Sequence, residues 1–392
     1  MSDSRIACLI LAATAAAIAL TGCGVGPTLT ESPAPPVATG ATGEMQGGQQ
    51  PIASATLQLY AVGNTGYGSA ATPLFSPTII TTATGGFTFP SNYCPSANPG
   101  ALVFLVGSGG QPAGAGTNIT NLNEAEMAVL GPCNRLNSSR HIRINGLTTI
   151  AAVWALAPFM SGTTNAYDHI GSSSTNPKGI QLAFEAAQEV TNTSTGAIGG
   201  TTLPAGATLP TNELNTLADI LGQCINSAGG AEGDGSNCGK LFLDAPNAAG
   251  TGYPTDTITS ALNIAQNPAR NVSALFNLVP PTPVFESVLP SAPNAWTVAI
   301  QYTGGGLNAP IAVAADRSGN IWFVNSGASS VSEFDNLGNS KLGATGVSTG
   351  TGAPTGLAID PGGNAWITVS TANSLFEITP PERSALPSRT TD

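Results

Sequence analysis

Apolar and polar positions alternate in the first folded stretch of the chain, from residue 51 to residue 145. In SATLQLYAV, residues 54–62, the apolar positions have the period of a strand with one buried face: Ala55, Leu57, Leu59 and Ala61. TIITTATGGFTF follows, with Gly85 and Gly86 where a hairpin turn would lie, and ALVFLVGSGG is typical of a buried strand. These short strands predict a small antiparallel β-sandwich.

The stretch from residue 146 to residue 285 changes to a helical pattern. Four segments place apolar residues three and four positions apart: 147–160, 176–192, 211–227 and 256–279. We therefore expect short helices, with a break at Asn267-Pro268 that divides the last segment into two. Apolar stripes of this kind are more often core than ligand groove, so we assign them to a core.

Two copies of one pattern occupy the C-terminal part of the chain, residues 286–380. Residues 316–334, DRSGNIWFVNSGASSVSEF, are followed by residues 360–378, DPGGNAWITVSTANSLFEI. The matched positions lie 44 residues apart, and they include Asp316 and Asp360, Gly319 and Gly363, Asn320 and Asn364, and Trp322 and Trp366. A period of this length that contains several short strands predicts β-propeller blades. About two blades fit, so the propeller is partial, and residues 381–392 show no strand pattern and are expected to be a disordered tail.

The repeated residues have a structural interpretation. The aspartates would close a turn, the glycines would supply positive φ, and the tryptophans would pack between blades. Ligand contacts are expected where the copies differ, for example at Arg317 or Asn325. Two blades cannot close a ring, so the missing ones are truncated, come from other chains, or are replaced by packing against the helical region.

The chain as a whole is predicted to be multi-domain and mainly β, with an α-helical insert between the sandwich and the partial propeller. Only 8% of its 392 residues are charged and its net charge is -11, so it lacks the basic surface that a nucleic acid requires. We expect no nucleic-acid partner.

The N-terminus has the layout of a secretory signal. Arg5 precedes an apolar run from Ile6 to Leu20, which is too short for a membrane-spanning helix, because that takes about 20 residues. Leu20-Thr21-Gly22-Cys23 resembles the lipobox of bacterial lipoproteins, which implies a signal peptide over 1–22 and lipid attachment at Cys23. An ordinary signal with an incidental cysteine is the alternative. Gly24 after the cysteine favours an outer-membrane lipoprotein that faces the periplasm or the cell surface. Residues 23–50 contain many breakers and predict a flexible tether.

Four cysteines remain after lipidation: Cys94, Cys133, Cys224 and Cys238. An even number in an exported chain indicates disulfides, although four cysteines allow three connectivities. The Gly-rich loop between Cys224 and Cys238 could bring those two together, which would leave Cys94 for Cys133. Metal binding is the rival interpretation, but the chain has no C-x-x-C and only two histidines, so we expect no metal and no cofactor.

Two regions resemble known families. The strand order of residues 51–145 resembles carboxypeptidase-regulatory-like sandwich modules, which implies a spacer or adhesion role. The phrase P-x-x-[VL]-A-x-D-x-x-G-N-x-W resembles NHL repeats, and most closely those of streptogramin-lyase-like propellers. Streptogramin lyases use a propeller histidine as base, and this chain has no histidine after His169.

The sequence offers no other clear catalytic pattern. It lacks H-E-x-x-H, the Walker phosphate loop and G-x-G-x-x-G. Asp168-His169 with the nearby serines is better explained as a polar loop than as a triad. We therefore predict a lipid-anchored cell-envelope protein that binds a protein or glycan partner through its propeller, and not an enzyme. The alternative is a propeller enzyme of lyase or lactonase type whose active-site blades are missing.

Overall fold

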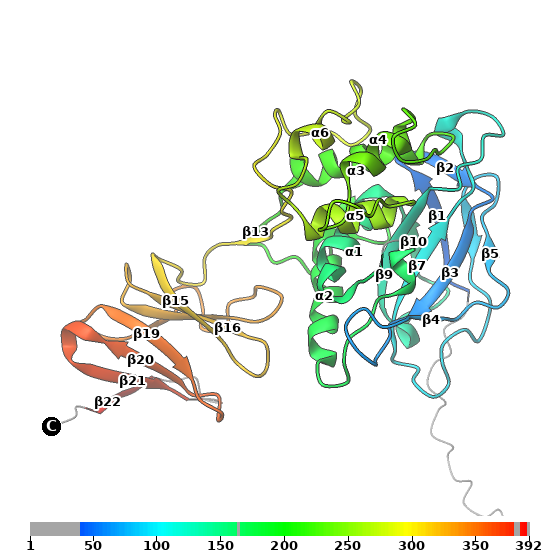
Figure 1. Ribbon diagram of the computed structural model, residues 1–392. Coiled ribbons are helices and arrows are strands. Elements are labelled where there is room, and N and C mark those ends of the chain that lie inside the picture. The colour runs from blue at the N-terminus through cyan, green and yellow to red at the C-terminus, as the bar shows by residue number, and fades with distance from the viewer. Residues whose placement is uncertain (1–39, 163–164, 380–384, 390–392) are drawn as a thin grey trace, which may run out of the picture. The chain divides into compact units, whose positions relative to one another are not determined.

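The computed structural model describes residues 40–162, 165–379 and 385–389, which form a mainly β chain with several sheets and some helices (Figure 1). Two five-stranded sheets open the chain. The first contains β1 (Thr42–Gly47), β2 (Gln50–Ala53), β6 (Gly86–Thr88), β8 (Gln111–Pro112) and β10 (His141–Ile144). The second contains β3 (Thr56–Ala61), β4 (Thr72–Pro73), β5 (Ile79–Ile80), β7 (Leu102–Ser108) and β9 (Ala125–Pro132).

The two sheets pack on each other through small and large apolar residues. Gly107 of β7 faces Met45 of β1, and any side chain at position 107 would overlap the Met45 sulfur. The long strands β3 and β7 pair antiparallel, as expected, and β9, for which no strand was predicted, pairs antiparallel with β7. In the first sheet, however, β10 pairs with β1 in parallel, which departs from the expected all-antiparallel arrangement. The resemblance to carboxypeptidase-regulatory-like modules stays a prediction.

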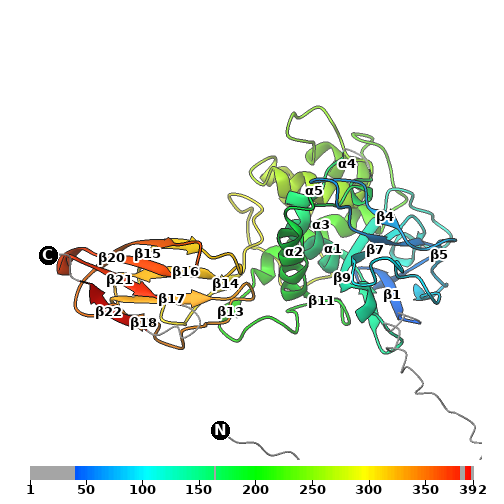
Figure 2. The same ribbon diagram turned by 90° about the horizontal axis from the view of Figure 1, so that it is seen from below.

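Within the described residues six α-helices follow, and both ribbon views place them on one side of these strands (Figures 1 and 2). They are α1 (Gly146–Leu156), α2 (Pro177–Val190), α3 (Thr211–Ile225), α4 (Asn237–Asp244), α5 (Thr257–Gln266) and α6 (Val272–Phe276). Asn145, Asn176, Ser236 and Asp256 cap four of the helices by accepting hydrogen bonds from backbone N–H groups in the first turn. The break at Asn267-Pro268 is confirmed, since α5 ends at Gln266.

Short elements connect these parts. The 3₁₀ turns are η1 (Ala113–Ala115), η2 (Cys133–Arg135), η3 (Ala157–Phe159) and η4 (Ala166–Asp168). Two small ribbons pair β11 (Thr191–Asn192) with β12 (Ala197–Ile198), and β13 (Ala207–Thr208) with β14 (Gln301–Tyr302).

The repeat region forms two four-stranded antiparallel sheets (Figure 2). One contains β15 (Pro310–Ala315), β16 (Ile321–Asn325), β17 (Ser330–Phe334) and β18 (Val347–Ser348). The other contains β19 (Pro354–Ile359), β20 (Ala365–Val369), β21 (Ser374–Ile378) and β22 (Ala385–Arg389), with η5 (Ser370–Ala372) between β20 and β21.

Two segments that lack a strand pattern form strands. Residues 42–47 lie in the stretch expected to be a tether but form β1, in which only Gly43, Met45 and Gly47 are buried. Ala385–Arg389 lies in the expected disordered tail but pairs with β21 as β22. In both cases backbone hydrogen bonds to a neighbouring strand decide the conformation, and these leave no trace in side-chain periodicity. The signal peptide and residues 23–39 of the expected tether lie outside the described residues, and Gln50 at the end of that stretch begins β2.

One hydrophobic core joins the strands before residue 145 to the helices after it. It includes Leu57 and Val103 from the second sheet, Ile150 from α1 and Leu217 from α3. The division expected at residues 145 and 146 therefore separates two kinds of secondary structure that share one core. A second, smaller core lies between the two sheets of the repeat region.

The outer edge of β9 is completed by threonine hydroxyls instead of by another strand. The Thr257 hydroxyl of α5 accepts a hydrogen bond from the Ala125 N–H (2.9 Å) and donates to the Ala125 carbonyl. Thr149 of α1 accepts from the Met127 N–H at 2.9 Å. These side chains satisfy buried backbone groups that a strand edge otherwise leaves open.

No helix within the described residues is long and apolar enough to span a membrane.

We predict that Thr257→Val lowers the free energy of unfolding of the full chain by about 1–3 kcal/mol, because it leaves a buried N–H and a buried carbonyl without partners. Denaturant unfolding followed by circular dichroism measures this loss. Thr202→Val, at an exposed position, is the control and should change the stability by less than about 0.5 kcal/mol. An equally small change for Thr257→Val would contradict the role of the hydroxyl at this edge.

Candidate functional site

The two copies of the sequence pattern form the same strand pairings in the two sheets of the repeat region. Trp322 lies opposite Ala314 on one side and Glu333 on the other. Trp366 lies opposite Ala358 and Glu377, the residues 44 positions further along. Both sheets also shift register at the first residues of their opening strands. The sequence period is therefore a structural period, strand by strand.

Asp316 holds the turn between β15 and β16. Its Oδ1 accepts hydrogen bonds from the N–H groups of Ser318 (2.8 Å) and Asn320 (2.9 Å). Its Oδ2 accepts from the Asn320 amide (2.7 Å) and from Trp322 Nε1 (3.3 Å). Burial alone would raise the pKa of Asp316, but the donated hydrogen bonds outweigh it and hold the pKa below its ordinary value.

Asp360 repeats this arrangement in the second sheet. Trp366 Nε1 donates to Oδ2 at 3.0 Å, the Asn364 N–H donates to Oδ1 at 2.9 Å, and the Asn364 amide donates to Oδ2 at 2.8 Å. These bonds, that from Trp366 first, lower the pKa of Asp360 from 3.8 to about 2. Gly319 and Gly363 have the same left-handed φ of 87°, which these turns require.

A third turn of the same kind was not found from the sequence period. Asp335 Oδ1 accepts from the N–H groups of Leu337 (3.0 Å) and Asn339 (2.9 Å), and Gly338 has a φ of 72°. The signal was present, since residues 335–339 read D-x-x-G-N like residues 316–320 and 360–364. The D-x-x-G-N motif therefore marks a kind of turn between strands, and it occurs more than once within one 44-residue repeat.

The repeated tryptophans differ in their surroundings. Trp322 is only 3% exposed and belongs to the core between the two sheets, whereas Trp366 is half-buried. That core contains Trp322, Val324, Val331, Ala365, Ile367, Val369, Phe376 and Ile378. Side chains from one face of each sheet therefore meet between them.

The two positions proposed as ligand contacts lie in different environments. Arg317 lines a small hollow of about 270 Å³ with the Asp316 turn and residues 361–363. Asn325 is fully buried and its amide serves the fold: Nδ2 donates to the Ser332 hydroxyl at 2.9 Å, and Oδ1 accepts from the Asn308 N–H. Asn325 is therefore occupied by the sheet itself.

A serine motif in this region was also missed. Residues 346–350 read G-V-S-T-G, which matches G-x-S-x-G. Ser348 lies on the short strand β18, which has no helix after it. A nucleophile elbow requires a sharp strand-to-helix turn, so the match has no catalytic context.

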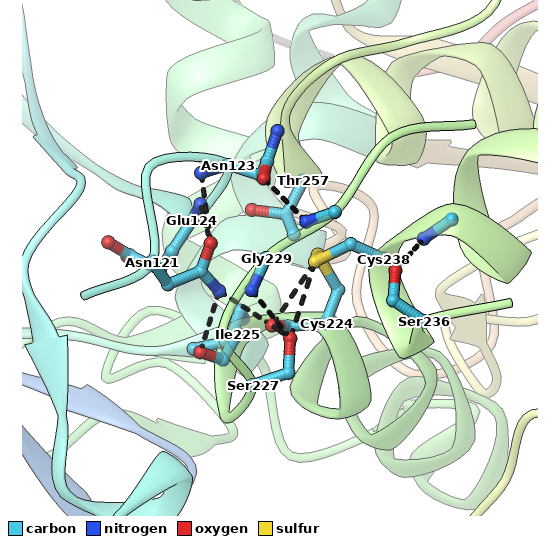
Figure 3. The surroundings of a disulfide bond; sticks show 12 residues. Asn121, Asn123, Glu124, Cys224, Ile225, Ser227, Gly229, Ser236, Cys238 and Thr257 are labelled. Carbon is cyan, nitrogen blue, oxygen red and sulfur yellow. Dashed lines mark hydrogen bonds between the residues drawn. A yellow bond between two sulfur atoms is a disulfide. The ribbon is translucent and has the colours of Figure 1, made fainter. Parts of the chain in front are cut away.

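Both disulfides lie in the body of the chain and join Cys94 to Cys133 and Cys224 to Cys238. The second ties the end of α3 to the start of α4, and Figure 3 shows its surroundings. The Asn121 amide reaches this point from the segment before β9 and donates to the carbonyls of Cys224 (2.7 Å) and Ile225 (3.1 Å). The last turn of α3 is thus fixed by a covalent bond and by two hydrogen bonds.

A cavity of about 810 Å³ adjoins this fixed end of α3. It is lined by Gly47, Gly48, Gln49, Gln50, Gly114, Asp219, Gly222, Gln223, Asn226, Asn237, Pro283, Val284, Phe285 and Glu286. Asp219 is 2% exposed, and burial raises its pKa, although the backbone N–H groups of Val284 and Phe285 counteract this by donating to Oδ1. No pattern in the sequence indicates the cavity, because its lining comes from five separate segments.

Two fully buried glutamates were also missed. Glu124 and Glu126 precede and begin β9, and none of their carboxylate oxygens has a hydrogen-bond partner in the described part of the chain. Burial raises both pKa values well above the ordinary range, and the neighbouring Glu126 raises that of Glu124 further. Alternation with Ala125 and Met127 is the one signal, and it could not say which face is buried.

The described residues contain no group of three or more His, Cys, Asp or Glu side chains placed to hold a metal ion. The lipid-attachment residue Cys23 lies outside the described residues, so that assignment stays a prediction.

No protein-family model and no curated protein matches the chain. Among solved structures, it is similar to virginiamycin B lyase from Staphylococcus aureus, with 21% identity over 20% of this chain and 25% of that chain and a TM-score of 0.18. A streptogramin B lyase structure is 24% identical over 19% of this chain and 24% of that chain, with a TM-score of 0.17. A protein of unknown function from Bacteroides caccae is 17% identical over 21% and 28%, with a TM-score of 0.18. The lyases among them are β-propeller proteins, and this chain spans about a quarter of their length.

We predict that Trp366→Phe raises the pKa of Asp360 from about 2 toward 3.8, because it removes the hydrogen bond that lowers it most. Because the pKa of Asp360 is lower in the folded than in the unfolded chain, its ionised carboxylate stabilises the turn above pH 3.8. This stabilisation is lost as the pH falls toward 2. The stability of the variant should therefore change less than that of the parent chain as the pH falls from 3.8 toward 2. Carboxyl NMR titration of Asp360 measures the shift; Trp154→Phe, in α1, is the control, and an unchanged Asp360 would contradict the turn chemistry.

Proposed function

We propose that this chain is an exported, lipid-anchored interaction protein whose repeat region assembles with further sheets of the same kind, supplied by a second copy of the chain. The proposal depends on one observation: side chains are exposed in one sheet at positions whose counterparts, 44 residues away in the other sheet, are buried.

The far face of the second sheet, which is the side that points away from the first sheet, is not covered by other described residues. Val331 is 0% exposed between the two sheets, but Leu375, 44 positions further along, is 41% exposed. Trp322 and Trp366 differ in the same direction, since the first is in the shared core and the second is half-buried. The second sheet covers one face of the first sheet, but the described residues leave the equivalent face of the second sheet uncovered.

The near face of the first sheet, which is the side that points away from the second sheet, is also partly uncovered. It corresponds to the side of the second sheet that packs on the first. Leu357 packs against the core between the sheets, whereas Val313, 44 positions before it, is 63% exposed. Part of this face is already covered, because the Ser332 hydroxyl donates to the Gly305 carbonyl at 2.7 Å. The uncovered part is the strand β15, where Ile311 is also exposed.

The far face of the second sheet and the near face of the first sheet can pack on each other. Their contact would repeat the packing of the first sheet on the second within one chain. An association of a far face with a near face is heterologous, and it forms a ring when the rotation closes. Propellers have about four to eight blades, so two to four copies, each with two sheets, would close one. The partner is therefore a protein sheet of this repeat type.

We predict that Val313→Asp and Leu375→Asp each reduce the full-length chain to a monomer, because each places a charge on one of the two faces. Sedimentation velocity of the detergent-solubilised protein measures the mass. Leu122→Asp is the matched control, since Leu122 is an exposed apolar residue outside the repeat region, and it should leave the assembly intact.

Mixing the two variants gives a sharper result. Val313→Asp retains the far face and Leu375→Asp retains the near face, so the mixture should form a dimer that cannot grow. A parent chain that is monomeric at all concentrations, or two variants that still assemble alone, would refute assembly through these faces.

We predict that Cys23→Ser moves the protein from the membrane fraction to the soluble fraction of its host, because the serine hydroxyl cannot carry the thioether-linked lipid. Intact mass spectrometry should find the parent chain starting at Cys23 with acyl chains attached and four hydrogens fewer than the reduced form. Ser32→Ala, in the expected tether, is the control. An unlipidated parent chain would remove the anchor from the proposal.

A further inference from the structure

A hollow of about 260 Å³ beside the end of β9 carries an inference that is independent of assembly through the repeat region. Arg135 of η2 and Arg140, just before β10, both line it, and none of the described residues that line it is Asp or Glu. The chain has only 11 basic residues and a net charge of -11. A wall with two arginines and no carboxylate therefore reverses, at one place, the charge of the chain as a whole.

Neither of these two guanidinium groups is paired within the described part of the chain. Two ion pairs are present there, and both use Glu44. Arg135 and Arg140 make no ion pair and no side-chain hydrogen bond with a described residue. Arg140 Nε is enclosed and out of reach of a ligand, but the terminal Nη atoms are not among the enclosed atoms, and Arg135 is exposed. Both side chains thus have N–H donors open to an anion.

Two buried threonines of the same hollow have hydroxyls without a partner. Thr191 is 2% exposed and Thr193 is 7% exposed, and both line the hollow. Neither hydroxyl makes a hydrogen bond with a described residue, yet neither is among the side-chain atoms that are enclosed without a partner. The hydroxyls are therefore accessible, and a ligand in the hollow can accept hydrogen bonds from them.

The main chain around these donors is fixed by bonds to other parts of the body. Cys133 begins η2, and its disulfide with Cys94 anchors the turn that carries Arg135. The Thr193 carbonyl accepts a hydrogen bond from the Arg143 N–H at 2.7 Å. Donors from separate segments thus meet at one hollow without a rearrangement of the main chain, which lowers the cost of binding.

We propose that this hollow binds a tetrahedral oxyanion, phosphate or sulfate, either free or as a small ester. A guanidinium group pairs with such an anion through two parallel N–H donors, and the threonine hydroxyls donate to the remaining oxygens. Four oxygens that point in different directions suit donors from several walls better than the two coplanar oxygens of a carboxylate.

The size of the hollow fits an anionic group of this kind. Its volume of about 260 Å³ lies just below the roughly 300–1,000 Å³ of small-molecule sites. A second hollow, of about 510 Å³, shares Pro132, Arg135 and Gln188 with the first, so it leaves room for the uncharged part of an ester.

Arg135→Gln and Thr193→Val test the site without breaking the fold. Arg135 is exposed and has no partner among the described residues, so glutamine removes only its charge. Valine is close to threonine in shape, and the Thr193 hydroxyl has no hydrogen bond within the described residues to lose, so the melting temperature should not fall. Lys240→Gln, at an exposed position of α4 outside the hollow, removes the same charge and is the matched control.

The experiment is titration calorimetry of the full chain with inorganic phosphate, sulfate and glycerol 3-phosphate at constant ionic strength, with acetate as the planar comparator. We expect phosphate or sulfate to bind with one site per chain, and its affinity to fall by more than about tenfold in Arg135→Gln and by about threefold in Thr193→Val. Lys240→Gln and Val313→Asp should retain the binding. Tighter binding of glycerol 3-phosphate than of phosphate would support an ester as the ligand, and weaker binding would support the free anion.

Three outcomes would overturn the proposal. The first is the absence of binding by phosphate, sulfate and glycerol 3-phosphate alike. The second is binding of acetate as tight as that of phosphate and sulfate, which would make the hollow an unselective place for anions. The third is binding that Lys240→Gln weakens as much as Arg135→Gln does, which would reduce the effect to the net charge of the chain.

Discussion

Backbone N–H and carbonyl groups at the edge of a buried strand must find partners, and the body of this protein depends on side-chain hydroxyls to supply them. Thr149 and Thr257 bond β9 from α1 and α5, so the helices complete the second sheet without adding a strand to it. This arrangement fixes how the helices sit on the sheet, because a hydroxyl reaches only one backbone position. The shared core, the closed end of α3 and the cavity beside it all follow from that placement.

The repeat region solves the problem of its turns differently. In the Asp316 and Asp360 turns one carboxylate accepts from backbone, amide and indole donors, so a single aspartate orders the loop and fixes the ring of the following tryptophan. The side chains in the core between the two sheets are apolar. Where two such sheets meet, these faces bury each other, and where the second is absent they are exposed.

Features with a long-range period could be predicted from the sequence, and features made by contacts between distant segments could not. The offset of 44 residues located both sheets of the repeat region, and spacing of three and four located the described α-helices except α4, which lies between two of the predicted segments. β1 and β22 depend on backbone pairing with neighbouring strands, and the alternation of β10 does not say that it pairs with β1 in parallel. Asp219 reads as one polar residue on an amphipathic helix, and only the fold brings Val284 and Phe285 to its carboxylate.

The Cys224–Cys238 bond has a consequence for where the cavity can exist. It closes a 14-residue loop and so constrains the unfolded chain by about 3 kcal/mol, and it links α3 to α4, which both contribute to the cavity wall. In a reducing cytosol the two helices lose that link. The end of α3 is then held by hydrogen bonds without a covalent link, among them those from Asn121 to the carbonyls of Cys224 and Ile225 and from Asn226 to the Gly47 carbonyl. The redox state of the surroundings thus sets the rigidity of the cavity: its wall is covalently closed under oxidising conditions and looser under reducing ones.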